Sequence, residues 1–189
     1  KKLFLLYFRN IHPKRLFQDL NWAFDIGNGT STYYDDAGND IARDAAGNIY
    51  VIGNFRGIVD FNPDGGTTNN ITSNFSKIQQ QWDLPRAFNI GSSNTDYGYG
   101  IAIDGSSNVY ITGSFLSTVD FNPAIGTTNN LFTNGGYDIF VAKYNSNGTY
   151  QWAFNIGGVS TDGGYGIAVD ASSNVYVTGS FRHTADFNP

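Results

Sequence analysis

Short runs of β-branched and aromatic residues, separated by clusters of Gly, Asn, Asp and Ser, follow one another along most of the chain. Between Gly166 and Phe181, two apolar runs are joined by the link Asp-Ala-Ser-Ser-Asn. Asp and Asn tolerate turn dihedral angles and hydrogen-bond their own backbone, so this link predicts a hairpin of two short strands. The same pattern predicts a second hairpin over residues 137–156, with its turn at residues 145–148.

One block of sequence occurs three times, which makes the chain an array of repeats. Ala42, Ala102 and Ala168 are equivalent positions in the three copies, and they are separated by 60 and 66 residues. Self-similarity at a fixed period indicates a repeat architecture. The copies of the block are residues 40–55, 100–115 and 166–181; each is preceded by Ala-Phe-Asp/Asn-Ile-Gly and followed by Asp-Phe-Asn-Pro.

The two predicted hairpins give each unit four antiparallel strands. Clean alternation of apolar and polar residues is missing from these strands, because Val175 and Val177 face one side and Tyr176 and Thr178 the other. Burial on both faces is what the blades of a β-propeller require. The sequence therefore predicts an all-β fold of β-propeller-type blades, with about three blades against the roughly 4–8 of a closed ring. The array is either part of a longer one or a protomer whose ring further copies complete.

The repeat also resembles a known family. Residues 162–170 and 174–180, together with the strand Asp138-Ile139-Phe140-Val141-Ala142-Lys143-Tyr144, are similar to the bacterial β-propeller repeat known as the SBBP repeat. The resemblance covers roughly residues 20–189. It implies a propeller blade of secreted or surface-exposed bacterial proteins, and it implies no catalytic residues.

Two segments depart from the repeat. Residues 1–19 carry five of the eleven Lys and Arg residues and a six-residue apolar run, so we interpret them as a partly buried edge strand, a tail or a remnant of a secretory signal. Residues 74–86 stand where a strand hairpin is expected but are shorter, and Pro85 cannot donate a ladder hydrogen bond. We expect that strand to be an edge, bulged or lost.

Composition narrows the classes of partner and chemistry. The chain has no Cys, which excludes disulfides and Cys-ligated metals. The net charge is −5, and residues 16–189 carry six basic against sixteen acidic side chains, which gives −10 for that part. Such a surface lacks the basic stripe that neutralises phosphates, so nucleic acid is not expected as a partner. Apolar runs fall far short of a membrane span of about 18–20 residues.

The acidic residues, all of which are Asp, offer one candidate metal site. Asp60, Asn62 and Asp64 form an Asp-x-Asn-x-Asp-Gly pattern, which supplies oxygen ligands in the order of a calcium loop. No bidentate Glu follows, so the other interpretation is a turn rigidified by Pro63. The recurring pairs Asp44/Asn48, Asp104/Asn108 and Asp170/Asn174 are interpreted as turn hydrogen bonds rather than metal ligands.

These observations predict a non-enzymatic scaffold or binding module that is extracellular or at the cell surface and meets a protein or a glycan there. His12 and His183 lie in no Ser/Asp motif, and no cofactor other than calcium is indicated. The alternative is a carbohydrate-binding propeller, because exposed aromatic rings between blades stack on sugars, whereas buried rings form the core. The candidate rings are Trp22, Trp152, Tyr97, Tyr99 and Tyr165.

Overall fold

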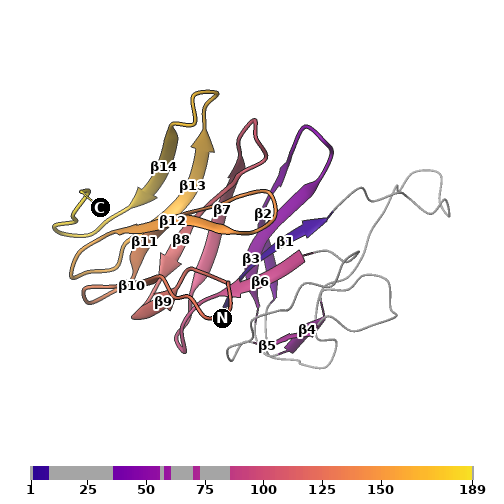
Figure 1. Ribbon diagram of the computed structural model, residues 1–189. Helices are drawn as coiled ribbons and strands as arrows, with labels where there is room; N and C mark the ends of the chain where they lie inside the picture. Colours follow the sequence, from indigo (N-terminus) through magenta and orange to yellow (C-terminus); the bar gives the residue numbers. More distant parts are fainter. Residues whose placement is uncertain (1, 9–35, 56–57, 61–69, 73–85, 189) are drawn as a thin grey trace.

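The computed structural model describes residues 2–8, 36–55, 58–60, 70–72 and 86–188, and every regular element in these ranges is an antiparallel β-strand (Figure 1). Within them no helix is long and apolar enough to cross a membrane. The strands are β1 (Lys2–Phe8), β2 (Ala37–Arg43), β3 (Ile49–Phe55), β4 (Ile58–Asp60), β5 (Asn70–Thr72), β6 (Arg86–Ile90), β7 (Tyr97–Ile103), β8 (Val109–Phe115), β9 (Thr118–Asp120), β10 (Asn130–Phe132), β11 (Asp138–Tyr144), β12 (Tyr150–Ile156), β13 (Gly163–Val169) and β14 (Val175–Ser180).

The middle unit is the four-stranded sheet that the repeat predicts. Its strands lie in the order β12-β11-β8-β7, so the two predicted hairpins, β7-β8 and β11-β12, sit side by side. The two-stranded ladder β9-β10 connects these hairpins, and the sequence pattern does not predict it. Every residue of β8 is buried, as expected of a strand with neighbours on both sides and both faces covered.

The first unit has the same four-stranded form, but one of its strands comes from elsewhere in the chain. Its order is β2-β3-β1-β6, so the N-terminal strand β1 occupies the place that β11 has in the middle unit. The expectation of an edge strand at the N-terminus is therefore wrong, because β1 pairs on both sides. The shortened segment expected to provide this strand falls, from residue 73 to 85, outside the described residues.

Strands β1 and β11, which hold equivalent places in the first and middle sheets, pair with their neighbours in the same register. Phe4 of β1 lies opposite Gly53 and Asn89, and Phe140 of β11 lies opposite Gly113 and Asn155. Gly113 follows Gly53 by one 60-residue repeat, and Asn155 follows Asn89 by one 66-residue repeat. Strand β1 therefore takes this place in the first unit without any shift along the sheet relative to β11.

The third unit consists of the hairpin β13-β14. Its inner strand β13 lies beside β7, and β7 in turn lies beside β2, so the equivalent first strands of the three units form a row (Figure 1). The units fan outwards from this row. This arrangement of antiparallel sheets is that of a β-propeller-type fold.

One apolar core joins the first two units. It contains Tyr50 and Ile52 of β3 together with Ile111, Phe115 and Phe140 of the middle sheet, all with at most 2% of their surface exposed. Gly113 lies in a crowded position within the middle sheet. A Cβ atom there would collide with the carbonyl oxygen of Tyr97 and would come within 2.8 Å of the Phe140 ring.

Interior pairing of β1 predicts that proline is poorly tolerated in it. Leu5 lies opposite Ile52 on one side and Phe88 on the other. Leu5→Pro removes a ladder donor and leaves an acceptor unpaired, so we expect a loss of about 2–4 kcal/mol in the free energy of unfolding. Gln151→Pro is the control, because Gln151 is exposed at a bulge in the outermost strand β12. Urea denaturation measures both; equal losses would contradict an interior β1.

Candidate binding surface

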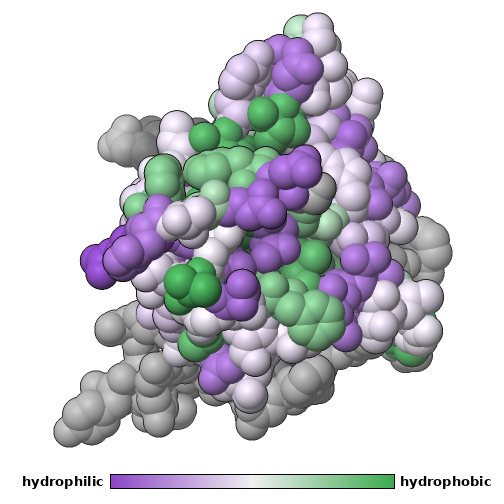
Figure 2. Space-filling model, turned by 90° about the vertical axis from the view of Figure 1, so that its left-hand side faces the viewer, coloured by the Kyte–Doolittle hydropathy of each residue, from purple (hydrophilic) through white to green (hydrophobic). Residues whose placement is uncertain are grey.

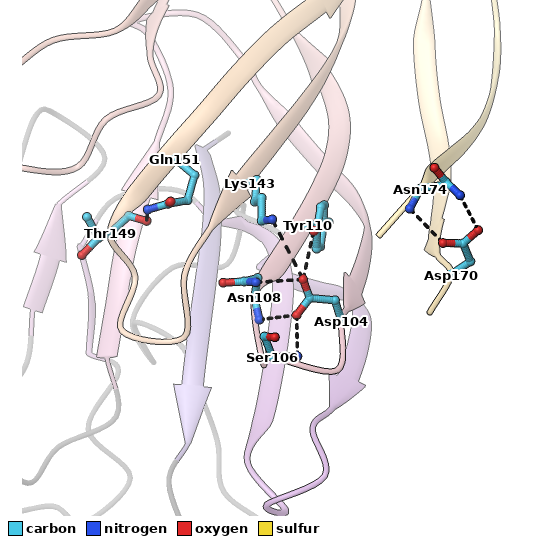
Figure 3. Close-up of polar contacts among 9 residues, drawn as sticks. All are labelled: Asp104, Ser106, Asn108, Tyr110, Lys143, Thr149, Gln151, Asp170 and Asn174. Carbon is cyan, nitrogen blue, oxygen red and sulfur yellow. Dashed lines mark hydrogen bonds and ion pairs between the residues drawn. The ribbon is translucent and has the colours of Figure 1, made fainter. Parts of the chain in front are cut away.

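The same polar cluster closes the first hairpin of all three units. In the middle unit, Asp104 Oδ1 accepts hydrogen bonds from the backbone N–H groups of Ser106 and Asn108, both at 2.9 Å. Its other oxygen accepts from Asn108 Nδ2 at 2.8 Å and from the Tyr110 hydroxyl at 3.0 Å (Figure 3). Lys143 approaches the same oxygen to 4.0 Å and lies over the Tyr110 ring. Each carboxylate oxygen is therefore engaged within the hairpin.

The first and third units repeat this geometry. Asp44 accepts from the backbone and side chain of Asn48 at 2.8 and 2.7 Å, and Asp170 accepts from those of Asn174 at 2.8 Å each. Tyr50 and Tyr176 donate their hydroxyl groups to these carboxylates. The predicted turn hydrogen bonds are confirmed, and these acids serve the turn.

These hydrogen bonds set the charge state of the acids. Burial, which is the largest single effect at Asp104, raises its pKa, but the bonds from Asn108, Tyr110 and Ser106 together hold the pKa below its ordinary value. At Asp44, burial again raises the pKa, but hydrogen bonds from Asn48 oppose it and the pKa is lowered overall. At neutral pH the hairpins therefore carry ionised carboxylates that accept from several donors at once.

This arrangement predicts a pH-dependent cost for Asp104→Asn. The amide places a donor against Asn108 Nδ2 and the Tyr110 hydroxyl, so we expect a loss of about 1–3 kcal/mol at pH 7. Because the pKa of Asp104 is lower in the folded state than in the unfolded state, the ionised carboxylate stabilises the fold at pH values above the unfolded-state pKa. This stabilisation is lost as the pH falls through the folded-state pKa. The difference from wild type should therefore shrink below about pH 4. Chemical denaturation against pH measures it, with the exposed Asp170→Asn as a matched variant of smaller effect. A cost that is constant from pH 7 to pH 3 would contradict this account.

The calcium candidate is described only in part. Asp60 ends β4, whereas Asn62 and Asp64 lie outside the described residues. In the second copy of the motif, Asp120 Oδ1 accepts from the backbone of Asn122 and Asn129 at 2.9 and 2.8 Å, and in the third copy Asp186 accepts from Asn188. These hydrogen bonds hold turns, as the turn interpretation of the motif predicts. Among the described residues no group of three or more acidic or His side chains is placed to hold a metal, and calcium at Asp60 stays a prediction.

Two buried acids at the starts of strands fix the loops between units. Asp96 accepts from the backbone of Ser92 at 2.7 Å and of Leu116 at 3.1 Å. Asp162, its equivalent in the third unit, accepts from the backbone of Gly158 at 3.0 Å and of Arg182 at 2.8 Å. Each carboxylate thus ties the loop before a hairpin to the residue after it. The sequence does not predict this role, because the backbone donor after each hairpin lies 20 residues beyond the acid.

Asp138 is also buried, but its surroundings raise its pKa, whereas those of Asp104 lower it. It is 1% exposed and accepts from Asn155 Nδ2 at 2.9 Å. Burial, the largest effect, raises its pKa; the Asn155 bond opposes this and the nearby charge of Asp162 adds to it, so the pKa is above its ordinary value. Folding therefore disfavours the ionised form of Asp138 relative to its ionisation in the unfolded chain.

Neutralising Asp138 is expected to stabilise the protein at neutral pH. A carboxyl whose folded-state pKa is raised costs stability as pH rises through the unfolded value, because the unfolded chain releases its proton first. Asp138→Asn keeps an oxygen that accepts from Asn155 and removes the charge, so its Tm should exceed that of wild type at pH 7 and approach it below pH 4. Asp162→Asn, equally buried but holding two backbone donors, should lower Tm. A lower Tm for Asp138→Asn at pH 7 would contradict the prediction.

Four tyrosines meet where the middle and third units join. The rings of Tyr97 and Tyr99 stack with centroids 5.6 Å apart and an interplanar angle of 9°. Tyr137 approaches Tyr97 at 6.1 Å, and Tyr165 approaches Tyr99 edge-on at 5.8 Å. We call Tyr97, Tyr99, Tyr137 and Tyr165 the tyrosine cluster. Burial, followed by the charges of the neighbouring tyrosines, raises the pKa of Tyr99 above its ordinary value.

β-Bulges place two of these rings. The pairing of β7 with β8 skips Tyr99, and that of β13 with β14 skips Tyr165. A bulged residue is released from the ladder and can be aimed away from the pleat. Tyr165 is 56% exposed, and its hydroxyl lies 2.9 Å from Ser180 Oγ. The cluster therefore offers aromatic faces and hydroxyl groups together at the surface.

The first unit has the same bulge without the same chemistry. Asn39 is the skipped residue, and its amide donates to the carbonyl of Gly98 at 2.7 Å and to Asn54 Oδ1 at 3.0 Å. The equivalent of Tyr97 is Ala37. The tyrosine cluster is thus particular to one of the two unit boundaries in the described part of the chain.

The remaining predicted residues lie apart from the cluster. Trp152 stacks on Phe154 and meets Tyr110 edge-on in the outer part of the middle sheet, while Trp22 and His12 lie outside the described residues. His183 Nδ1 lies 3.1 Å from Ser160 Oγ, a pair that sequence reasoning missed because 23 residues separate them. His183 is exposed and Ser160 is half-buried, and among the described residues no hydrogen bond joins the imidazole to an acidic side chain that would orient it for nucleophilic catalysis.

Comparison with known proteins agrees with this fold. Residues 90–114 match the family model of the SBBP β-propeller repeat, which confirms the resemblance for the segment that contains β7 and β8. An uncharacterized WD repeat-containing protein of Acanthamoeba polyphaga mimivirus is 30% identical over 112 residues, which are 52% of this chain and 8% of that protein. The chain therefore spans a small part of this relative. Both matches support a repeat scaffold or binding module of the β-propeller class.

Proposed function

We propose that this chain is a non-enzymatic binding module of a secreted or cell-surface bacterial protein, and that the tyrosine cluster contacts a protein partner. The extracellular setting rests on the resemblance to the SBBP repeat, which is confirmed over residues 90–114. The polar clusters described above hold hairpins and loops in place, and their carboxylates are occupied by backbone and amide donors. They leave the fold rigid and its aromatic surface available for contact.

The observation that carries the proposal is the grouping of four tyrosines at one unit boundary. Tyrosine is enriched at the centres of protein interfaces, because it brings a large contact area at a low cost in side-chain entropy and a hydroxyl that bonds at the rim. Tyr165 is exposed, and the half-buried Tyr99 and Tyr97 support it through ring contacts. This arrangement holds the rings in place before a partner arrives.

A carbohydrate ligand is the second candidate. Exposed aromatic rings with adjacent hydroxyl groups also suit the stacking and hydrogen bonding of sugars, and Tyr165 with Ser180 provides both. A lectin built on equivalent grooves would repeat such clusters at every boundary. Asn39 stands at the corresponding place in the first unit, so the repeat of grooves is missing there, and this observation favours the protein partner.

Binding to cells of the organism that encodes the chain separates the two candidates. Fluorescently labelled protein is expected to bind intact cells, and protease treatment of the cells should abolish the signal while periodate oxidation of their glycans leaves it. Tyr165→Ala should weaken binding by about tenfold or more, as for a central interface tyrosine. Phe132→Ala, equally exposed but on β10, should not weaken it. A signal lost to periodate and kept after protease would instead support the lectin, and no binding at all would contradict both.

A further inference from the structure

Two buried acids adjoin the tyrosine cluster. Asp138 follows Tyr137 in the chain, and the backbone N–H of Asp162 donates to the Tyr137 carbonyl at 2.7 Å. Both acids are 1% exposed, and the charge of Asp162 is close enough to raise the pKa of Asp138. The boundary between the middle and third units therefore holds two carboxyl groups in its interior, next to the rings of the cluster.

These two acids form no ion pair with a described residue. The bonds to Asp162 come from backbone N–H groups, and the bond to Asp138 comes from the Asn155 amide. The other oxygen of Asp138, Oδ1, is buried and has no hydrogen-bond partner among the described residues. The one ion pair between described residues joins Lys143 to Asp104. Hydrogen bonds spread a negative charge but do not cancel it, so the field of this boundary favours a cation.

The corresponding place in the first sheet carries the opposite charge. Lys2 of β1 lies opposite Phe55, and Asp138 of β11 lies opposite Phe115, which follows Phe55 by one 60-residue repeat. The chain thus provides a basic residue at this register position in the first sheet and an acidic residue in the middle sheet. The middle sheet therefore lacks, next to the tyrosine cluster, the positive charge that the first sheet has.

The aromatic rings of the cluster suit the same kind of ligand. The face of a Tyr ring attracts an ammonium or guanidinium group that lies within about 6 Å of its centre. The middle unit already contains such a contact, because Lys143 Nζ lies 4.8 Å from the centre of the Tyr110 ring and 4.0 Å from Asp104 Oδ2. The cluster rings of the middle unit stay half-buried, and so partly open to solvent, although β7 has a neighbouring unit on each side.

The surrounding surface favours a charged contact over a purely apolar one. On the side of the third unit, apolar patches are interrupted by polar ones (Figure 2). Residues 16–189 carry six basic against sixteen acidic side chains. A basic partner is therefore attracted at long range, whereas an acidic partner is repelled.

We propose that the tyrosine cluster binds a Lys or Arg side chain of the partner protein, with the cationic group over the ring faces and the buried acids Asp138 and Asp162 favouring its charge. This inference rests on the proposed function and names the chemistry that the partner presents. The rings make the contact, because they reach the surface. The enclosed acids act through the interior of the protein, where a charge is screened less than in water.

Two peptides that differ only in charge are the probes. One is acetyl-Gly-Gly-Arg-Gly-Gly-amide, and the other carries citrulline, the neutral isostere of arginine, at its centre. Each is titrated into the intact chain, and the ring signals of ¹³C-labelled tyrosine are followed by NMR. The arginine peptide should shift the cluster signals to saturation, and the citrulline peptide should bind about fivefold more weakly or less tightly still, because it lacks the charge. Equal affinity for the two peptides would overturn the proposal.

Variants separate the rings from the field of the acids. Tyr99→Leu should weaken binding of the arginine peptide by about tenfold, and Tyr99→Phe, which keeps the ring face, should restore most of it. Asp138→Asn should weaken binding by about threefold while it raises the Tm, so that loss of the fold cannot explain the effect. Asp170→Asn is the matched control, because it changes the net charge equally at a turn of the third unit. Equal losses in the two Asp→Asn variants would overturn the role of the boundary acids.

Competition on cells distinguishes this inference from the proposed function. Excess arginine peptide should displace the labelled protein from cells, and the citrulline peptide should not. Cell binding through a protein partner that the arginine peptide fails to displace would overturn the cationic contact and leave the proposed function standing. Saturable binding of the arginine peptide to a chain that binds no cells would support the cation site and contradict the proposed function.

Discussion

The third strand of each unit is the element on which the rest of the sheet depends. In the middle unit, β11 supplies backbone pairing to β8 and β12 and places Phe140 opposite Gly113 and against the Phe121 ring. In the first unit, β1 supplies the same pairing, and Tyr50, Ile52 and Phe55 of β3 are buried. Where the described residues provide no such strand, in the third unit, the equivalent side chains stay exposed. Among the described residues, the second strand of a unit is therefore buried where a third strand pairs with it.

Local polar chemistry makes the units uniform before they pack. The Asp–Asn–Tyr cluster engages each carboxylate oxygen inside its own hairpin, and its geometry is the same in buried and exposed copies. A turn fixed in this way needs no support from neighbouring units, so the hairpin can be copied along the chain. Asp96 and Asp162, at the strand starts, each join the loop before a hairpin to the residue that follows the hairpin.

The bulged residue of each first strand differs in chemistry between the units. The bulge in each first strand frees one residue from pairing, and this residue is Asn39 in the first unit and Tyr99 or Tyr165 in the others. Asn39 ties two units together through the carbonyl of Gly98, whereas the tyrosines gather into a surface cluster. A single bulged position therefore supplies a hydrogen bond between units at one boundary and part of a tyrosine cluster at the next. Such positions change without cost to the sheet, which suits a binding module built from repeats.

Much of the fold could be predicted from the sequence, because its determinants are local or repeated. The hairpin turns follow from Asp104 and Asn108 and their equivalents, and the four-stranded unit follows from two apolar hairpins in each period. Strand β1 was misjudged because its partners, β3 and β6, lie at least 40 residues away, and pairing across that distance leaves no local signal. The sequence predicts Tyr97, Tyr99 and Tyr165 only as separate candidates and does not point to Tyr137. The contact between Tyr99 and Tyr165 depends on how two units meet, and that between Tyr97 and Tyr137 joins residues 40 positions apart.

Strands β8 and β14 show which features local sequence determines and which features tertiary structure determines. Their sequences differ only at Ile111 and Val177, and both form the second strand of a hairpin with the same turn and bulge. Sequence alone determined that much, because backbone preference and turn bonds act over a few residues. Tertiary structure decided the burial of β8, because the strand that covers its edge, β11, comes from another part of the chain, whereas β14 pairs only with β13 among the described residues.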